Sequence, residues 1–219
     1  MNVQMVVRCG VIVVGIAATL LVSAGYRKID EGPKTLTGKS KLYFECMLVA
    51  IGITAIYMII RYSPEVDPIM SWKRIAFLPL LWYIAYYDYK HKLILNEFLL
   101  MGIGLRGMLL IPELLIGGRD SLAVIVSELV GALILFLFGI MFRFLSRNGM
   151  GAGDVKLFAI LPLFMGALGG LRAVFSGMVI IFLAACIFLI TKRKGLKDEL
   201  PFAPSIALGC WFIMFANYV

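Results

Sequence analysis

Charged residues are scarce in this chain. Only 16% of its 219 residues are Asp, Glu, Lys or Arg, whereas 62% are hydrophobic, and the mean hydropathy is +0.97. A soluble domain carries about 25% charged residues. The composition therefore excludes an ordinary soluble protein and indicates an integral membrane protein.

Residues that bind metals are also few. The chain has a single histidine, His91, and four cysteines, none of which forms a C-x-x-C pair. A zinc site requires clustered ligands, so we expect no metal site and no cofactor. The cysteines all lie in apolar segments and are predicted to be buried and inert. They are Cys9, Cys46, Cys186 and Cys210.

Long apolar runs dominate the sequence and predict transmembrane helices. A helix needs about 20 residues to cross a hydrocarbon core of about 30 Å. We therefore expect an all-α, polytopic membrane helix bundle with about eight spans. The first span has no clear small-residue cleavage site after it and is predicted to be retained. The expected spans are residues 5–24, 42–60, 75–87, 98–116, 122–144, 155–168, 173–190 and 202–219.

The distribution of Lys and Arg predicts the orientation in the membrane. Fourteen of the 21 basic residues lie on one side, and six lie on the opposite side, among them Lys73 and Arg74. The richer side is expected to be cytoplasmic, which puts both termini outside and Asp88 and Asp154 at the cytoplasmic face. The net charge of +8 is spread over the connections between spans. We therefore expect no binding to nucleic acid.

Two aspartates lie where expected spans meet cytoplasmic connections. Asp88 ends the third span, and Asp154 precedes the sixth. Taken singly, Asp88 is interpreted as a solvated carboxylate and Asp154 as a helix N-cap. Two carboxylates at the same depth can instead share a proton, so that one takes a proton from water while the other donates to a peptide carbonyl. The pair predicts an intramembrane aspartic protease with Asp88 and Asp154 as catalytic residues.

Glycines surround the second aspartate. Gly151 and Gly153 can adopt positive φ and let another backbone approach closely. We expect them to shape a site for an extended substrate strand, because a helical substrate would hide its peptide bonds. Lys156 is a candidate to hold substrate or to lower a carboxylate pKa, and it is equally suited to anchor the helix end.

Two further charged residues lie inside expected spans. Arg106 is in the fourth span and Glu128 in the fifth. Either side chain would be costly if it faced lipid. We expect the two to form a structural ion pair with each other and to have no part in catalysis.

At these residues the sequence resembles the prepilin peptidase family, whose members are membrane aspartic proteases. The family's second motif reads GMGAGDVKL at residues 149–157, including the Val-Lys-Leu after the aspartate. The first motif runs from Asp88 to Asn96, with Leu95 in place of the usual proline. The segment PFAPSIALG, which begins at Pro201, resembles the last-helix signature of the family. The resemblance extends from about residue 75 to the C-terminus.

This resemblance implies a leader peptidase of type IV or tight-adherence pilins. It implies a multi-pass protein of the bacterial or archaeal cell membrane, the inner or plasma membrane, with its active site facing the cytoplasm. The expected reaction is removal of a short basic leader after a glycine. The expected partners are a pilin-like precursor and the lipid bilayer, with pilus or secretion machinery as a further candidate. The expected substrate-binding residues are Gly151, Gly153, Asn96 and Lys156.

The same resemblance sets expectations for the domains. Residues 1–72 are expected to form two membrane helices with a basic cytoplasmic loop, and residues 73–219 a six-helix peptidase core. Larger members of the family carry two C-x-x-C pairs in a cytoplasmic segment and also N-methylate the new terminus with S-adenosylmethionine. The first cytoplasmic loop here has no cysteine. We therefore expect no methyltransferase activity.

Three alternatives remain open at this point. The first is a transporter or channel in which Asp88, Glu128 and Asp154 form a proton or cation path. The second is a catalytically silent assembly protein in which the aspartates only cap helices. The third is a presenilin-like protease, although the Val-Lys-Leu sequence and the small size favour the prepilin group.

Overall fold

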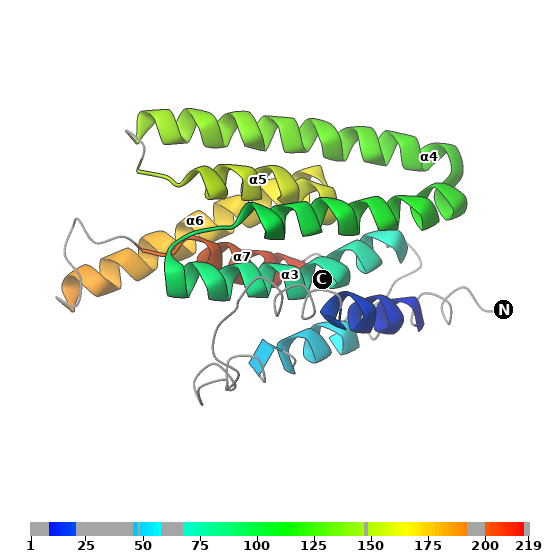
Figure 1. Cartoon of the computed structure of the whole chain (residues 1–219), viewed down its shortest axis with the longest axis horizontal. Coiled ribbons are helices and arrows are strands. Elements are labelled where there is room, and N and C mark those ends of the chain that lie inside the picture. Colours follow the sequence, from blue (N-terminus) through cyan, green and yellow to red (C-terminus); the bar gives the residue numbers. More distant parts are fainter. Residues whose placement is uncertain are drawn as a thin grey trace.

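The computed structural model describes residues 9–20, 46–47, 49–57, 68–146, 149–191 and 200–216. All regular elements in these ranges are helices, which confirms the predicted all-α class. The longer ones lie along one another in an elongated bundle (Figure 1). They are α3 (Pro68–His91), α4 (Asn96–Leu145), α5 (Ala152–Met165), α6 (Ala167–Ile190) and α7 (Ala203–Ala216).

Helix α4 is folded back on itself as a hairpin. Its 50 residues would extend for about 75 Å if straight, more than twice the thickness of a hydrocarbon core. Figure 1 shows the chain reversing its direction at the right of the view. The two arms, Asn96–Ile116 and Asp120–Leu145, are each long and apolar enough to cross a membrane. They agree with the fourth and fifth predicted spans.

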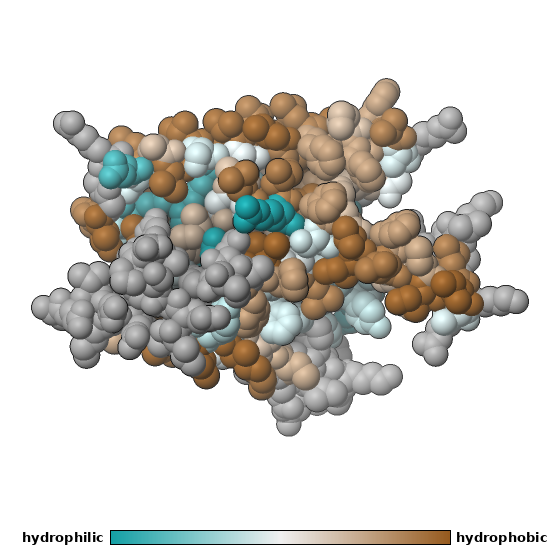
Figure 2. All heavy atoms as spheres, turned by 180° about the vertical axis from the view of Figure 1, so that it is seen from behind, coloured by the Kyte–Doolittle hydropathy of each residue, from teal (hydrophilic) through white to brown (hydrophobic). Residues whose placement is uncertain are grey.

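Apolar side chains are exposed along the outer surface of the bundle. In the second arm of α4 they dominate the upper edge of the view in Figure 2. Such a surface suits contact with lipid. In the part of the chain that the structure describes, the two arms of α4 and helix α6 meet the length and hydropathy of a membrane span. The full set of eight spans and the sides of the termini stay predictions. The exposed residues of the second arm include Val126, Leu129, Leu133, Leu137 and Met141.

The predicted boundary between the sixth and seventh spans is wrong. Helix α5 ends at Met165 and α6 begins at Ala167, whereas the sequence placed the break between residues 168 and 173. The break occurs at Gly166, whose φ of 79° is a conformation that other residues rarely adopt. Gly170 lies inside α6, where an added Cβ would come within 2.8 Å of Pro162. This glycine permits close packing of α6 on α5 and does not end a helix.

Helix α3 begins earlier than the predicted span at 75–87. It includes Lys73 and Arg74, which we had assigned to an external connection. That assignment is wrong, because Lys73 is completely buried and Arg74 is buried as well. Burial of Lys73 is possible because it is paired with carboxylates, as described below. The domain division expected between residues 72 and 73 falls within this helix.

The N-terminal helices support the rest of the bundle. In helix Cys9–Leu20, Gly10 lies against the ring of Trp72 on α3, and an added Cβ would approach it to 2.5 Å. Residues 49–57 pack on α7, where the indole Nε1 of Trp211 donates to Thr54 Oγ1 at 2.8 Å. The first two spans therefore contact the two helices that, as shown next, hold Asp88.

The prediction of four buried cysteines is wrong for two of them. Cys210 is buried in α7 and Cys186 is partly buried, whereas Cys9 and Cys46 are exposed on the protein surface. An apolar sequence context does not distinguish a side chain that faces lipid from one that faces a protein core.

Candidate active site

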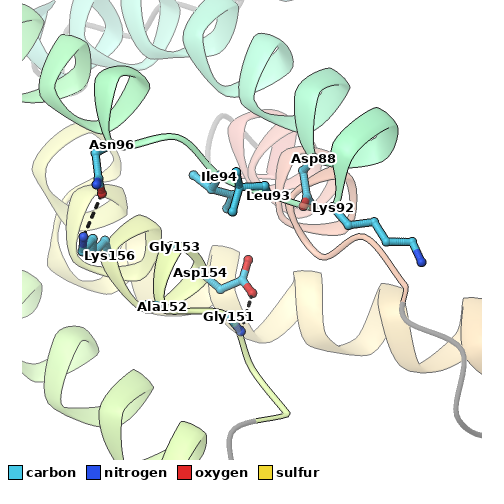
Figure 3. Close-up of a pocket in the computed structure, with 10 residues that line it drawn as sticks. All are labelled: Asp88, Lys92, Leu93, Ile94, Asn96, Gly151, Ala152, Gly153, Asp154 and Lys156. Carbon is cyan, nitrogen blue, oxygen red and sulfur yellow. Dashed lines mark hydrogen bonds between the residues drawn. The ribbon is translucent and has the colours of Figure 1, made fainter.

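The carboxyl end of α3 and the amino end of α5 lie at the same end of the bundle, at the left of Figure 1. Asp88 is in the last turn of α3, and Asp154 is in the first turn of α5. Both side chains point into one cavity of about 260 Å³, which the connection from Lys92 to Asn96 also lines (Figure 3). The fold thus brings together two carboxylates that are 66 positions apart in the sequence.

Asp88 is a buried carboxylate. Its side chain is 5% exposed, so its interpretation as a solvated surface group is wrong. Its Oδ2 accepts a hydrogen bond of 2.8 Å from the backbone N–H of Ala203, the first residue of α7. Burial raises the pKa of Asp88, while the backbone N–H groups of Ala203 and Phe202 act to lower it.

Asp154 also interacts with a helix N-terminus, that of its own helix. The N-cap of α5 is Gly151, so the interpretation of Asp154 as the N-cap is wrong. Asp154 Oδ2 accepts a hydrogen bond of 3.1 Å from the Gly151 N–H. Burial and the charge on Asp88 raise the pKa of Asp154 to about 7, against the effect of the Gly151 bond. A carboxyl group with this pKa is suited to donate and accept protons near neutral pH.

The two glycines act differently from the prediction. Gly151 has a φ of −64°, and among the glycines that the structure describes only Gly166 has a positive φ. The expected positive φ at Gly151 and Gly153 is therefore wrong. At Gly153 an added Cβ would lie 2.7 Å from Ile94 Cβ and 3.1 Å from Ile94 O. The glycine is needed because the chain's own connection between α3 and α4 passes directly over it.

Asn96 and Lys156 connect the elements that carry the aspartates. Lys156 Nζ donates a hydrogen bond of 2.7 Å to Asn96 Oδ1, the dashed line at the left of Figure 3. Both residues line the cavity. Helix α4 begins at Asn96 with Leu95 as N-cap, so the missing proline does not prevent the helix from starting there.

The connection after α3 contains a backbone conformation that no sequence pattern predicts. Lys92 has a φ of 54°, which is uncommon for a residue other than glycine. Its N–H donates a hydrogen bond of 2.7 Å to the Asp88 carbonyl and so closes the end of α3. In Figure 3 its side chain extends away from Asp154.

A second buried cluster of charges lies toward the other end of α3. The predicted pair of Arg106 and Glu128 is confirmed, with Arg106 Nη2 2.7 Å from Glu128 Oε2. Two further members, Lys73 and Glu113, were not predicted from the sequence. Lys73 Nζ lies 2.8 Å from Glu113 and also contacts Glu128, and Arg106 Nη2 lies 2.6 Å from Glu113 Oε2. The signal for Glu113 was its position inside the fourth predicted span, where an unpaired carboxylate would be costly.

This cluster bears on the transporter alternative. Glu128 contacts Lys73 and Arg106 and does not line the cavity of Asp88 and Asp154. The structure therefore brings two of the three proposed path carboxylates together and leaves the third in the ion-pair cluster. Within the described residues, no group of three or more His, Cys, Asp or Glu side chains is placed to hold a metal ion.

Known proteins resemble this chain over the same region. Residues 75–191 match the type IV leader peptidase family. A prepilin leader peptidase/N-methyltransferase of Bacillus subtilis is 32% identical over 170 residues, which are 78% of this chain and 62% of the relative. A protein of the same name from Xanthomonas campestris pv. campestris is 29% identical over 131 residues, 58% of this chain and 44% of the relative. The alignments thus span less than two thirds of either relative. No solved structure matches the chain.

Proposed function

Because the chain belongs to the type IV leader peptidase family, we propose that it is a membrane aspartic endopeptidase that removes the leader from pilin-like precursors. The observation that carries the proposal is the cavity shared by Asp88 and Asp154. Burial and mutual repulsion favour a state with one proton on the pair. Hydrolysis by two carboxylates requires this state, because one must be a base and the other an acid.

The position of the cavity suits a substrate that meets the membrane surface. It lies where α3 ends and where α5 and the first apolar arm of α4 begin. A precursor whose apolar helix spans the bilayer would present its leader junction at this depth. The excess of Lys and Arg that the sequence predicts on the side of Asp88 and Asp154 supports a cytoplasmic location for the cavity.

Four residues around the cavity are proposed to bind the substrate strand. Gly151 and Gly153 place no side chain next to Asp154, and the hydrogen-bonded pair of Asn96 and Lys156 supplies polar groups at the side of the cavity away from Asp88. Ile94 packs on Gly153 in the present structure. We propose that the substrate backbone enters beside Ile94, between the two aspartates.

Methylation of the product is proposed to be absent. Both relatives carry N-methyltransferase in their names, and each extends well beyond the region that this chain matches. The sequence has no C-x-x-C pair, whereas the larger family members that methylate their product carry two. The product should therefore carry an unmodified amino terminus.

The test is cleavage of a pilin-like precursor by the full chain in proteoliposomes. The precursor should have a basic leader and a glycine before its apolar helix, and a precursor encoded next to this gene is the best choice. We expect one cut after the glycine, seen by mass spectrometry, with no added methyl group when S-adenosylmethionine is present. Cleavage that persists in both Asp88→Asn and Asp154→Asn would refute the aspartic mechanism.

A further inference from the structure

The amino end of α7 contacts one member of the aspartate pair and not the other. The backbone N–H of Ala203 donates to Asp88 Oδ2 at 2.8 Å, across 115 positions of sequence. The N–H of the preceding Phe202 also acts on this carboxylate. Asp154 instead accepts a bond from Gly151 at the start of its own helix.

A helix N-terminus favours a negative charge placed against it. Its first N–H groups have no partner within the helix, and the helix dipole adds partial positive charge there. The first turn of α7 contains no acidic residue of its own, so Asp88 supplies the anion from α3. Among the described residues, the titratable groups that share the cavity with Asp88 are Lys92, Asp154 and Lys156.

The same end of α7 is fixed against the helix that carries Asp154. The ring of Phe202 lies 5.6 Å from the ring of Phe158 on α5, centroid to centroid. Phe158 is completely buried. Phe202 thus contacts α5 while the next residue, Ala203, holds Asp88. The Pro201–Phe202–Ala203 segment therefore orients Asp88 relative to Asp154.

We propose that the amino end of α7 is a positioning element that keeps Asp88 as the ionised member of the pair and leaves the proton on Asp154. This inference rests on the proposed peptidase function. Asp88 then takes a proton from water as the water oxygen bonds to the peptide carbon, while Asp154 gives its proton to the carbonyl oxygen. The intermediate breaks its C–N bond as Asp88 passes its proton to the leaving nitrogen and Asp154 recovers one from a hydroxyl. Both carboxyl groups return to their starting states.

Burial, and next the charge on Asp88, raise the pKa of Asp154 to about 7, which agrees with a proton held on Asp154.

The first experiment needs no substrate. Carboxyl titration of full-length protein with labelled aspartate should give a lower pKa for Asp88 in Asp154→Asn than for Asp154 in Asp88→Asn. The reverse order would overturn the proposal. Since no cleavage is measured, this result is separate from any failure of the peptidase function.

The second experiment removes the N–H donor itself. Ala203→Pro deletes this group at the first helical position, where proline is tolerated, and Ala203→Gly keeps it. We expect the acid limb of kcat/KM to move up by about one pH unit in the proline variant and to stay in place in the glycine variant. A uniform loss of activity in Ala203→Pro without movement of the limb would show a structural role only and overturn the proposal. If Ala203→Pro does not fold, the carboxyl titration of the two asparagine variants decides the matter.

Discussion

Two clusters of buried ionisable groups lie toward opposite ends of α3, about 22 Å apart along the helix. Near the start of α3, Lys73 and Arg106 contact the carboxylates of Glu113 and Glu128, so two positive and two negative groups meet. Near its end, Asp88 and Asp154 face a common cavity, and the charge of one raises the pKa of the other. The carboxylates of the first cluster are held in ion pairs, whereas Asp88 and Asp154 accept hydrogen bonds from backbone N–H groups.

The difference separates a cluster suited to a structural role from a pair that, on the proposed function, carries out chemistry. Paired charges inside a bundle are held in one ionisation state, and losing one partner leaves a buried charge uncompensated. Two neighbouring carboxylates that form no ion pair instead change protonation state at modest cost. Asp88 and Asp154 also line a cavity of about 260 Å³, whereas the side chains of the charged cluster are buried.

The strongest test of this comparison is activity. Asp88→Asn and Asp154→Asn should each lower cleavage by about 10²–10⁴-fold, because each removes half of a proton-transfer pair. Glu128→Gln should cleave at close to the wild-type rate per folded molecule. Precursor cleavage in proteoliposomes, normalised to folded protein, measures both. Loss of cleavage in folded Glu128→Gln equal to that in the aspartate variants would contradict the separation of roles.

The free energy of unfolding should fall more in Glu128→Gln than in Asp88→Asn or Asp154→Asn. Glu128→Gln leaves Lys73 and Arg106 with one carboxylate, and we expect the free energy of unfolding to fall by about 3–5 kcal/mol. The double variant Lys73→Met/Glu128→Gln removes one charge of each sign and should recover part of that loss. Thermal unfolding of Lys73→Met, Glu128→Gln and the double variant in detergent tests this double-mutant cycle. Strictly additive losses would mean that the two residues do not interact.

The dependence on pH sharpens the comparison further. Asp154 has a pKa of about 7 in the folded chain and 3.8 in the reference state, so the folded state binds the proton more tightly. Its contribution to stability is therefore full below about pH 4 and is lost as pH rises to about 7. Cleavage should decline above pH 7 as Asp154 loses its proton. Unfolding midpoints and kcat/KM measured across this range test both trends, and Asp154→Asn should remove the trend in stability.

Gly153 provides the smallest of the expected effects. Gly153→Val introduces a side chain into the space of Ile94, and we expect a loss of about 1–3 kcal/mol of stability together with weaker cleavage. Ala152→Ser, at an exposed neighbouring position, is the matched control and should be mild. Cleavage and unfolding are measured for both variants at matched expression. Normal cleavage by Gly153→Val would show that the close packing of Ile94 is dispensable.

Short-range patterns were sufficient to predict much of this site. The two glycines before an apolar run placed Asp154 at the start of a helix, although its N-cap is Gly151. The change to basic residues placed Asp88 at a helix end. The Arg106–Glu128 pair followed from the cost of charges in lipid. Each of these signals depends on residues near in sequence or on the bilayer, and both are visible without a structure.

Other features depended on packing and were missed. Lys73 looked like a loop residue because its partners are 40 and 55 positions away. The sequence offered positive φ or close approach of a substrate strand as the reason for Gly153, whereas its requirement comes from Ile94 of the same chain. The link from Ala203 to Asp88 is a backbone contact, which no side-chain pattern encodes.

The sequence by itself determined that this is an apolar helical protein with two aspartates at helix ends, because composition and local order reflect the solvent that each segment meets. Only the tertiary structure decided that the aspartates share one cavity and that a distant helix holds Asp88. It also decided that the other buried charges neutralise one another. These outcomes depend on distances between groups remote in sequence, and interaction between charges depends on distance and burial, which are fixed only when the helices pack.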